Sequence, residues 1–160
     1  MDLNGEFRIK ASKEAVWDAL NDPEILKQCI PGCQELKKTS DTEMTAKAVI
    51  KIGPVKAKFS GAVTLSDVDA PNSYIISGEG KGGAAGFAKG GAAVTLEEDG
   101  AETVLQYTVN AAVGGKLAQL GGRLIDAASK KLSREFFDKF ADLVGEEPAT
   151  AEISEKEATA

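Results

Sequence analysis

Apolar residues recur at spacings of three and four along residues 115–144, which places them on one face of a helix. The stripe consists of Leu117, Leu120, Leu124, Ala128, Leu132, Phe136, Phe140 and Val144. The pattern therefore predicts one long helix over this stretch, with Gly145 in a left-handed C-terminal cap. Gly121 and Gly122 lie inside the helix, where each costs about 1 kcal/mol relative to Ala. Their presence indicates a packing or functional use for the space that they leave.

Alternation of apolar and polar residues predicts strands in most of the remaining chain. Residues 3–9 form the first strand. Two short helices follow, because Ser12 is a good N-cap and Asp22 before Pro23 is a second helix start. Alternation then continues over residues 35–113. It is interrupted by turn or connecting sequences at 53–54, 69–73, 82–83 and 98–100.

Short turns between successive strands predict an antiparallel meander. The expected fold class is therefore α+β: a strand, two short helices, an antiparallel sheet and one long helix packed across that sheet. Residues 1–145 form this domain, since a chain of 160 residues is long enough for one hydrophobic core. Residues 146–160 are acidic and nearly free of large apolar side chains, which predicts a disordered tail.

Charge and composition exclude several classes of function. The net charge is −6 and the chain has no basic run, so nucleic-acid binding is not expected. No apolar run approaches the roughly 20 residues of a membrane span. The N-terminus lacks the basic-then-apolar pattern of a signal peptide. We therefore expect a cytoplasmic location.

The two cysteines, Cys29 and Cys33, carry no predicted chemistry. Without His they cannot complete a tetrahedral zinc site unless carboxylates join them. A disulfide across Pro31 and Gly32 is geometrically possible, but it is not needed in a reducing compartment. We interpret both residues as small thiols at a helix-to-strand turn, and predict neither a metal nor a cofactor.

The sheet face that meets the long helix carries small side chains at its centre. They are Ala46, Ala48, Gly61, Gly78, Gly80, Ala88, Gly90 and Ala92. On the helix side, Gly121 and Gly122 lack side chains and so leave further space. Protein interiors normally fill to a density near ~0.75, so either helix and sheet pack unusually close or a cavity remains. We favour a cavity with an apolar ligand, because a curved sheet stands off from a long helix in the middle.

The predicted ligand-binding residues combine this small-residue face with larger apolar neighbours from the sheet and the helix. They are Phe59, Ile76, Gly78, Gly80, Phe87, Tyr107, Leu117, Leu120, Gly121 and Leu124.

No catalytic residue is predicted, because general acid–base catalysis usually draws on His or on buried carboxylates. The chain has no His, and its carboxylates fall at turns, on wet helix faces or, as with Glu6 and Glu79, on the outer face of strands. The Gly-rich segment 78–86 lacks the Gly-Lys-Ser/Thr ending of a phosphate-binding loop.

Four sequence motifs resemble the CoxG family of carbon monoxide dehydrogenase subunits, within the START-like, Bet v 1-type (SRPBCC) helix-grip superfamily. They are IPGC at 30–33, KIGPVKAKFSG at 51–61, GEGKGGAAGFAKG at 78–90, and VGGKLAQLGGRLID at 113–126 with FF further on. Together they extend over nearly all of the chain up to Leu143. The resemblance implies the helix-grip fold, with a curved antiparallel sheet wrapped around the C-terminal helix.

The same resemblance implies an accessory role beside a molybdenum-containing hydroxylase of the CO dehydrogenase type. The expected partners are that enzyme complex, a hydrophobic small molecule such as a respiratory quinone or lipid, and the inner face of the cell membrane as a peripheral contact. Some family members carry a C-terminal membrane-binding segment, whereas residues 146–160 here are acidic and would be repelled by anionic lipid.

Three hypotheses follow. The protein is a non-catalytic carrier of an apolar ligand that links the enzyme to the membrane, or a recruitment subunit with no physiological ligand, or a cyclase- or hydrolase-like enzyme of the same fold. The first is our prediction. Lipophilic material that co-purifies with the protein would favour it over the second.

Overall fold

The structure is a computed structural model that describes residues 2–145. Its elements follow the predicted order: β1 (Asp2–Ile9), α1 (Lys13–Leu20), α2 (Pro23–Cys29), β2 (Cys33–Ser40), β3 (Glu43–Ile52), β4 (Val55–Asp69), β5 (Ser73–Lys81), η1 (Gly83–Ala85), β6 (Phe87–Asp99), β7 (Glu102–Gly114), α3 (Lys116–Gln119) and α4 (Gly122–Val144). The tail predicted for residues 146–160 lies outside the described residues.

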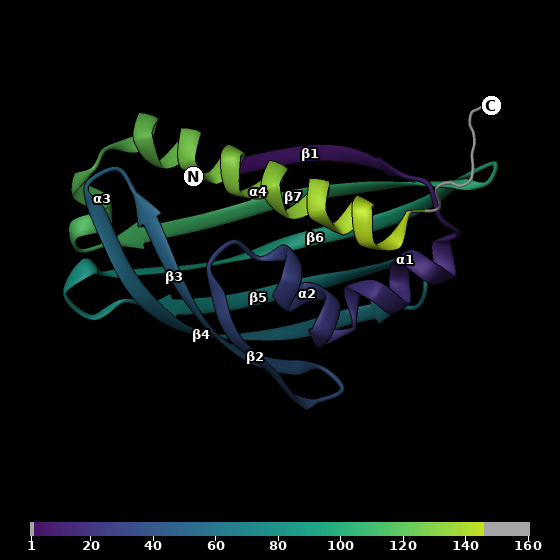
Figure 1. Cartoon of the computed structure of the whole chain (residues 1–160), viewed down its shortest axis with the longest axis horizontal. Coiled ribbons are helices and arrows are strands. Elements are labelled where there is room, and N and C mark those ends of the chain that lie inside the picture. Colours follow the sequence, from purple (N-terminus) through teal and green to yellow (C-terminus); the bar gives the residue numbers. More distant parts are fainter. Residues whose placement is uncertain (1, 146–160) are drawn as a thin grey trace.

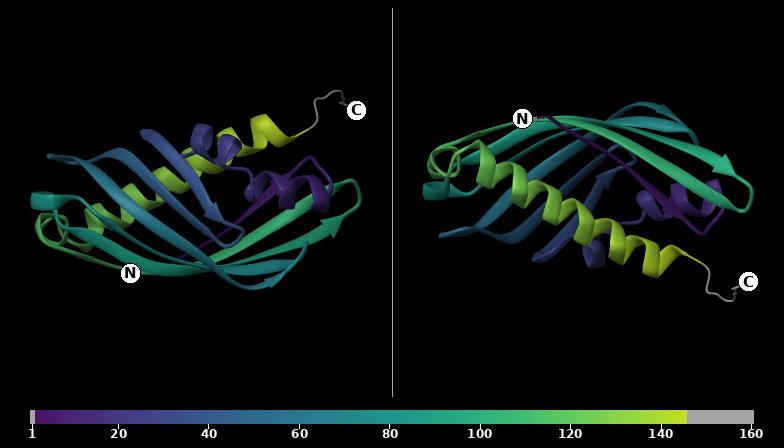
Figure 2. Two further views of the ribbon diagram at one scale, coloured as in Figure 1. Left: turned by 90° about the horizontal axis from the view of Figure 1, so that it is seen from below. Right: turned by 90° about the horizontal axis from the view of Figure 1, so that it is seen from above.

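The seven strands form one sheet in the order β1-β7-β6-β5-β4-β3-β2, and every neighbouring pair is antiparallel. Strands β2 to β7 make the predicted meander, and β1 extends the sheet at its far side by pairing with β7. The sheet curves so that its concave face is turned toward α4, which crosses the open side of the sheet (Figures 1 and 2). The predicted α+β architecture is confirmed.

Side-chain caps fix where the two short helices begin. The Ser12 hydroxyl accepts a hydrogen bond from the Ala15 amide at 3.1 Å. The Asp22 carboxylate accepts one from the Glu24 amide at 2.9 Å, and Pro23 occupies the first turn of α2. Each cap satisfies an amide that the first turn of a helix would otherwise leave without a partner. Both predicted helix starts are confirmed.

The prediction of one unbroken helix over 115–144 is wrong. The four residues of α3 end before Leu120, and Gly121 has φ +89°, so the chain turns before α4 begins at Gly122. A helix interior would have cost Gly121 and Gly122 conformational entropy, and the break between the helices avoids that cost. The predicted left-handed cap at Gly145 is also wrong, because its φ is −67° and its amide bonds instead to the Ala141 carbonyl at 2.7 Å.

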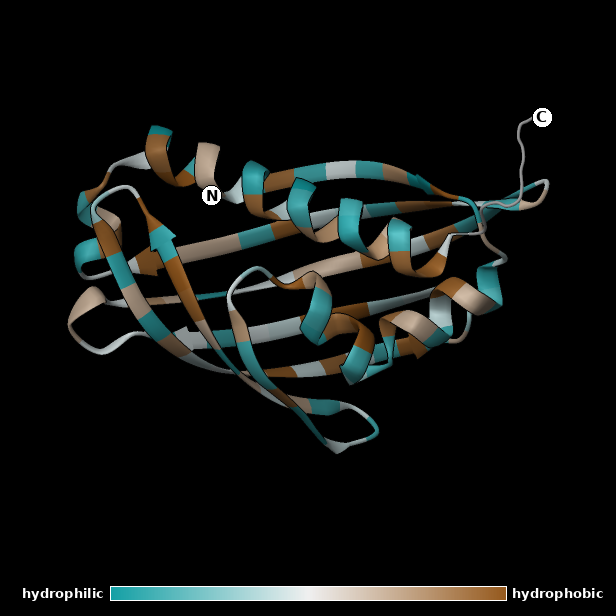
Figure 3. Cartoon of the chain, viewed as in Figure 1, coloured by the Kyte–Doolittle hydropathy of each residue, from teal (hydrophilic) through white to brown (hydrophobic). Residues whose placement is uncertain are grey.

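The best-packed part of the core lies at one end of the molecule, where the last turns of α4 meet α1 and α2. Its largest fully buried side chains are Ile9, Val16, Leu105 and Phe140, each less than 2% exposed. The apolar stripe of α4 faces this cluster and the concave sheet, while its charged residues face outward (Figure 3). The backbone of α4 lies closest to β1 and β3, on either side of the middle strands.

Candidate ligand-binding site

A chamber of about 430 Å³ lies between the concave face of the sheet, α2 and the second half of α4. We call it the deep chamber. Leu26 of α2 and Ile30 just after it close one side, and Leu132 and Phe136 of α4 close another. The middle strands supply the floor. It forms because α4 contacts the flanks of the sheet and spans the strands between them. This volume lies within the roughly 300–1,000 Å³ typical of sites for small molecules.

A second chamber of about 400 Å³ continues from the first along β4 to β7, toward η1 and α3. We call it the shallow chamber. Small residues line it, including Ala46, Gly61, Gly80 and Ala88. The two chambers share six lining residues: Met44, Ala46, Val63, Ile76, Ala92 and Val109. They are therefore two parts of one apolar cavity.

The glycines of the shallow chamber differ in the space beside them. A Cβ atom added to Gly80 would have no heavy atom within 4 Å. A Cβ added to Gly78 would lie 2.8 Å from the Val63 side chain, and one on Gly61 would lie 3.1 Å from the Glu79 carbonyl oxygen. Close approach of neighbouring groups thus accounts for Gly61 and Gly78, whereas Gly80 leaves real open volume.

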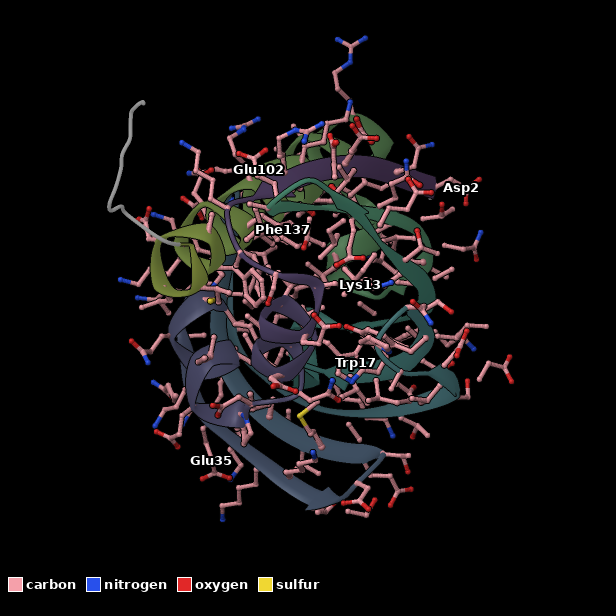
Figure 4. All side chains as sticks on the ribbon, turned by 90° about the vertical axis from the view of Figure 1, so that its right-hand side faces the viewer. Asp2, Lys13, Trp17, Glu35, Glu102 and Phe137 are labelled. Carbon is pink, nitrogen blue, oxygen red and sulfur yellow. The ribbon has the colours of Figure 1, made fainter. Side chains whose placement is uncertain are left out.

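Aromatic rings form one wall of the deep chamber. Phe137 stacks on Phe7 at 4.4 Å between ring centroids and on Tyr107 at 5.4 Å. Phe136 packs edge-on against Phe137 at 4.9 Å. In the end-on view of Figure 4, Phe137 lies between α4 and the sheet, whereas Glu35 points to the outside of the molecule. The stacked rings fix the distance between α4 and the β1 side of the sheet.

Polar groups are few in the deep chamber. Among the described residues, the polar side chains that line it are Tyr74, Tyr107 and Ser133. Burial raises the pKa of Tyr74 well above its usual value, and its hydroxyl makes no hydrogen bond to any described residue. No carboxylate, Lys or Arg of residues 2–145 lines this chamber. Acid–base or electrostatic chemistry on a bound molecule therefore has no charged group to use there.

The predicted site residues fall into two groups. Ile76 and Tyr107 line the deep chamber, and Ile76, Gly78 and Gly80 line the shallow one. The other six lie around the Gly-rich end and line neither chamber: Phe59, Phe87, Leu117, Leu120, Gly121 and Leu124.

Three members of the second group have identifiable neighbours. The Phe59 ring lies against the backbone of Gly82, the Phe87 ring against Gly114, and the Leu124 side chain against Gly53. These contacts hold together the loops at the Gly-rich end. Leu117 is buried there, Leu120 is half-buried, and Gly121 is exposed with open space beside it.

Sequence reasoning missed the helix side of the deep chamber, which comes from α2 and from Leu132, Phe136 and Phe137. Leu132 and Phe136 belong to the predicted apolar stripe, so their burial is expected. Their position in a cavity wall could not be predicted, because nothing in the local pattern marks where along α4 the sheet is separated from the helix.

Neither cysteine takes part in the cavity wall. Cys29 is buried and Cys33 half-buried, and both are free thiols. Burial raises the pKa of Cys29 to about 11, so its thiolate is scarce near neutral pH. The Cys33 thiol donates to the Glu35 carbonyl at 3.4 Å. Within residues 2–145, no group of three or more Cys, Asp or Glu is placed to hold a metal ion.

Comparison with known proteins shows the family to which this chain belongs. The sequence model of CoxG, a family of carbon monoxide dehydrogenase subunits, matches residues 5–145. The chain belongs to the CoxG family. Among curated proteins, none matches the sequence. No helix among the described residues of this CoxG-family chain is long and apolar enough to cross a membrane.

Solved structures agree with the fold. A conserved protein from Geobacillus kaustophilus is 33% identical to this CoxG-family chain, with a TM-score of 0.85 over 90% of this chain and 95% of that one. Norcoclaurine synthase from Thalictrum flavum is 17% identical, with a TM-score of 0.60 over 90% and 92% of the two chains. Ara h 8.0201 is 12% identical, with a TM-score of 0.62 over 90% and 97%. The last two are Bet v 1-like proteins, which confirms the predicted helix-grip fold.

Proposed function

We propose that this protein carries an apolar molecule in its two-chamber cavity, as a non-catalytic accessory protein of a CO dehydrogenase-type molybdenum hydroxylase. The observation that supports this most directly is a continuous apolar cavity whose deep part is lined by no charged side chain of the described residues. Membership of a family named for a component of CO dehydrogenase supports the enzyme partner. The cavity excludes water from an apolar guest, and this burial is the main source of affinity.

A respiratory quinone or a lipid fits this cavity best. Each chamber alone has the volume of a small-molecule site. Together they would accept the ring or head group of the ligand in the deep chamber and its hydrocarbon chain in the shallow chamber. A charged metabolite would lose its hydration without gaining a counter-ion from the deep chamber. Catalysis is not proposed, because no described nucleophile with an adjacent base lines the deep chamber. Glu79 and Lys89 border the shallow chamber, but alternation along β5 and β6 places their side chains on the outer face of the sheet.

Native mass spectrometry of the freshly purified protein tests the carrier function. We expect a bound quinone or lipid near one molecule per chain, because an apolar cavity of this size is costly to leave filled only with water. Organic extraction and mass analysis of the released material identify its class. A clean ligand-free mass that stays unchanged after mixing with quinone-loaded vesicles would overturn the carrier function in favour of a recruitment role.

We further propose that the Gly-rich end of the domain contacts the inner face of the cell membrane. This end comprises residues 51–58, 80–90 and 114–124, at the left of Figure 1. It holds seven of the 19 Lys and Arg and none of the 25 Asp and Glu. The seven are exposed and form no ion pair within residues 2–145: Lys51, Lys56, Lys58, Lys81, Lys89, Lys116 and Arg123.

Two further observations support this surface. Phe87 and Leu124 are large apolar residues that remain 38% and 37% exposed at the same end. The shallow chamber extends toward this end, so a lipid-soluble guest would have a short path from the bilayer. The opposite end holds six acidic residues and no Lys or Arg in its two turns, 66–72 and 97–102. Anionic lipid attracts the first end and repels the second.

Lys56→Gln should weaken binding to vesicles that contain anionic lipid about fivefold, since each cation near such a surface contributes about 1 kcal/mol. It should slightly stabilise the free protein, because Lys56 lies directly opposite Lys51 across β3 and β4. Co-sedimentation with phosphatidylglycerol vesicles measures the first effect. The control is Lys10→Gln, which removes the same charge at the other end of the sheet. Equal losses of vesicle binding in both variants would contradict the proposed surface. So would a wild-type protein that does not sediment with the vesicles.

A further inference from the structure

We propose that the Tyr74 hydroxyl donates a hydrogen bond to a neutral acceptor oxygen of the bound molecule. The deep chamber would then select apolar compounds that carry a carbonyl or ether oxygen over pure hydrocarbons and over fatty carboxylates. This inference rests on the proposed carrier function and specifies the chemical class of its ligand.

The first support is that the Tyr74 hydroxyl is buried without a partner. Tyr74 is 5% exposed, and its hydroxyl makes no hydrogen bond to any described residue. The contrast is Thr103, which is 0% exposed and donates its hydroxyl proton to the Ala11 carbonyl at 2.8 Å. Buried polar side chains are normally paired, so an unpaired phenol in a core calls for an explanation.

The second support is the position of Tyr74. It lines the deep chamber from β5, where it pairs with Val94 of β6. The Trp17 ring packs edge-on against it at 5.3 Å between centroids, which holds the phenol in place. A preorganised donor in an apolar wall is the arrangement that gives a small-molecule site its orientation and specificity.

The third support is what surrounds the phenol. Within the described part of the chain no Lys or Arg lines the deep chamber, so a carboxylate there would lack a cation to pair with. The Tyr107 hydroxyl lies over the Gly5 backbone on the β1 side of the sheet. Ser133 also lines this chamber, but it is only half-buried. Tyr74 is thus the fully buried donor that a neutral acceptor would meet, and a hydrocarbon would leave it unpaired.

Tyr74→Phe tests the inference with two probes of the same shape: an alkyl-substituted 1,4-naphthoquinone and the naphthalene hydrocarbon with the same alkyl group. We expect calorimetry to show about a three- to tenfold weaker affinity for the quinone in the variant, and no change for the hydrocarbon, because only the quinone loses a net hydrogen bond. The melting temperature of the ligand-free variant should equal or exceed that of the wild type, since the substitution removes an unpaired hydroxyl.

Thr103→Val is the matched control, because it removes a buried hydroxyl that has a partner and does not line the cavity. It should lower the melting temperature and leave the affinity ratio of the two probes unchanged. Equal affinity of wild-type protein for both probes, or equal losses of both in Tyr74→Phe, would overturn the Tyr74 inference alone. If the wild type binds neither probe, the proposed carrier function fails for this ligand class and the inference fails with it.

Discussion

Gly80→Leu is expected to keep the fold and lose the ligand. The Gly80 backbone does not have a positive φ, and a Cβ there meets no atom within 4 Å, so a leucine side chain enters the shallow chamber without strain. Replacing a strand glycine also removes its entropic disadvantage. The melting temperature should therefore stay near that of the wild type. Affinity for an alkyl naphthoquinone should fall tenfold or more, because inserting carbon into filled space typically costs ~1–3 kcal/mol.

Quenching of Trp17, the single tryptophan of the chain, measures this loss, since its ring packs against a wall residue of the deep chamber. Gly122→Leu is the matched control: Gly122 also has open space, but it is exposed and lines neither chamber. Gly121 is not suitable as a control position, because its φ of +89° would strain the backbone of any residue with a side chain. A large drop in the melting temperature of Gly80→Leu would show that the shallow chamber is filled by protein, and would count against the cavity.

Phe140→Ala should produce the largest loss of stability, about 3–5 kcal/mol, as is typical when a buried phenylalanine is truncated. Phe140 is 0% exposed and stacks on Phe136 at 6.0 Å between ring centroids. It anchors the last turns of α4 in the cluster formed with α1 and β7. Urea denaturation followed by circular dichroism measures the change in the free energy of unfolding.

Leu143→Ala is the control for Phe140→Ala on the same helix. Leu143 is 39% exposed, so its truncation should change the free energy of unfolding by less than about 1 kcal/mol. If both variants lower the free energy of unfolding by the same amount, Phe140 does not anchor α4. The aromatic cluster around Phe140 then contributes less to stability than its burial indicates.

The order of the elements could be predicted because its signals are local. Ser12 and Asp22 cap their helices through bonds to amides two or three residues away, and alternation marks each strand of the meander. The helix break at Gly121 was missed because Leu117, Leu120 and Leu124 keep a helical spacing across it. The cost of two adjacent glycines is the available signal, and our prediction attributed it to a packing or functional use of the space rather than to a break.

The candidate site was predictable on its sheet side only. Period-two parity placed Ile76, Gly78, Gly80 and Tyr107 on the concave face, and all four line the cavity. Which part of α4 faces the open volume depends on how far the sheet bends and on where α2 packs. Both are long-range properties that no local pattern encodes, so the predicted set followed the helix toward Leu124 and missed Phe137.

The concentration of the core at the α1 end has a consequence for motion. The cluster around Phe140 must come apart only in global unfolding, whereas the strand ends beside η1 and α3 hold few large buried side chains. Regions with little buried apolar contact open locally at a small fraction of the global free energy. Under the proposed carrier function, guest molecules would exchange through the Gly-rich end by brief local openings, while the opposite end keeps the native topology throughout.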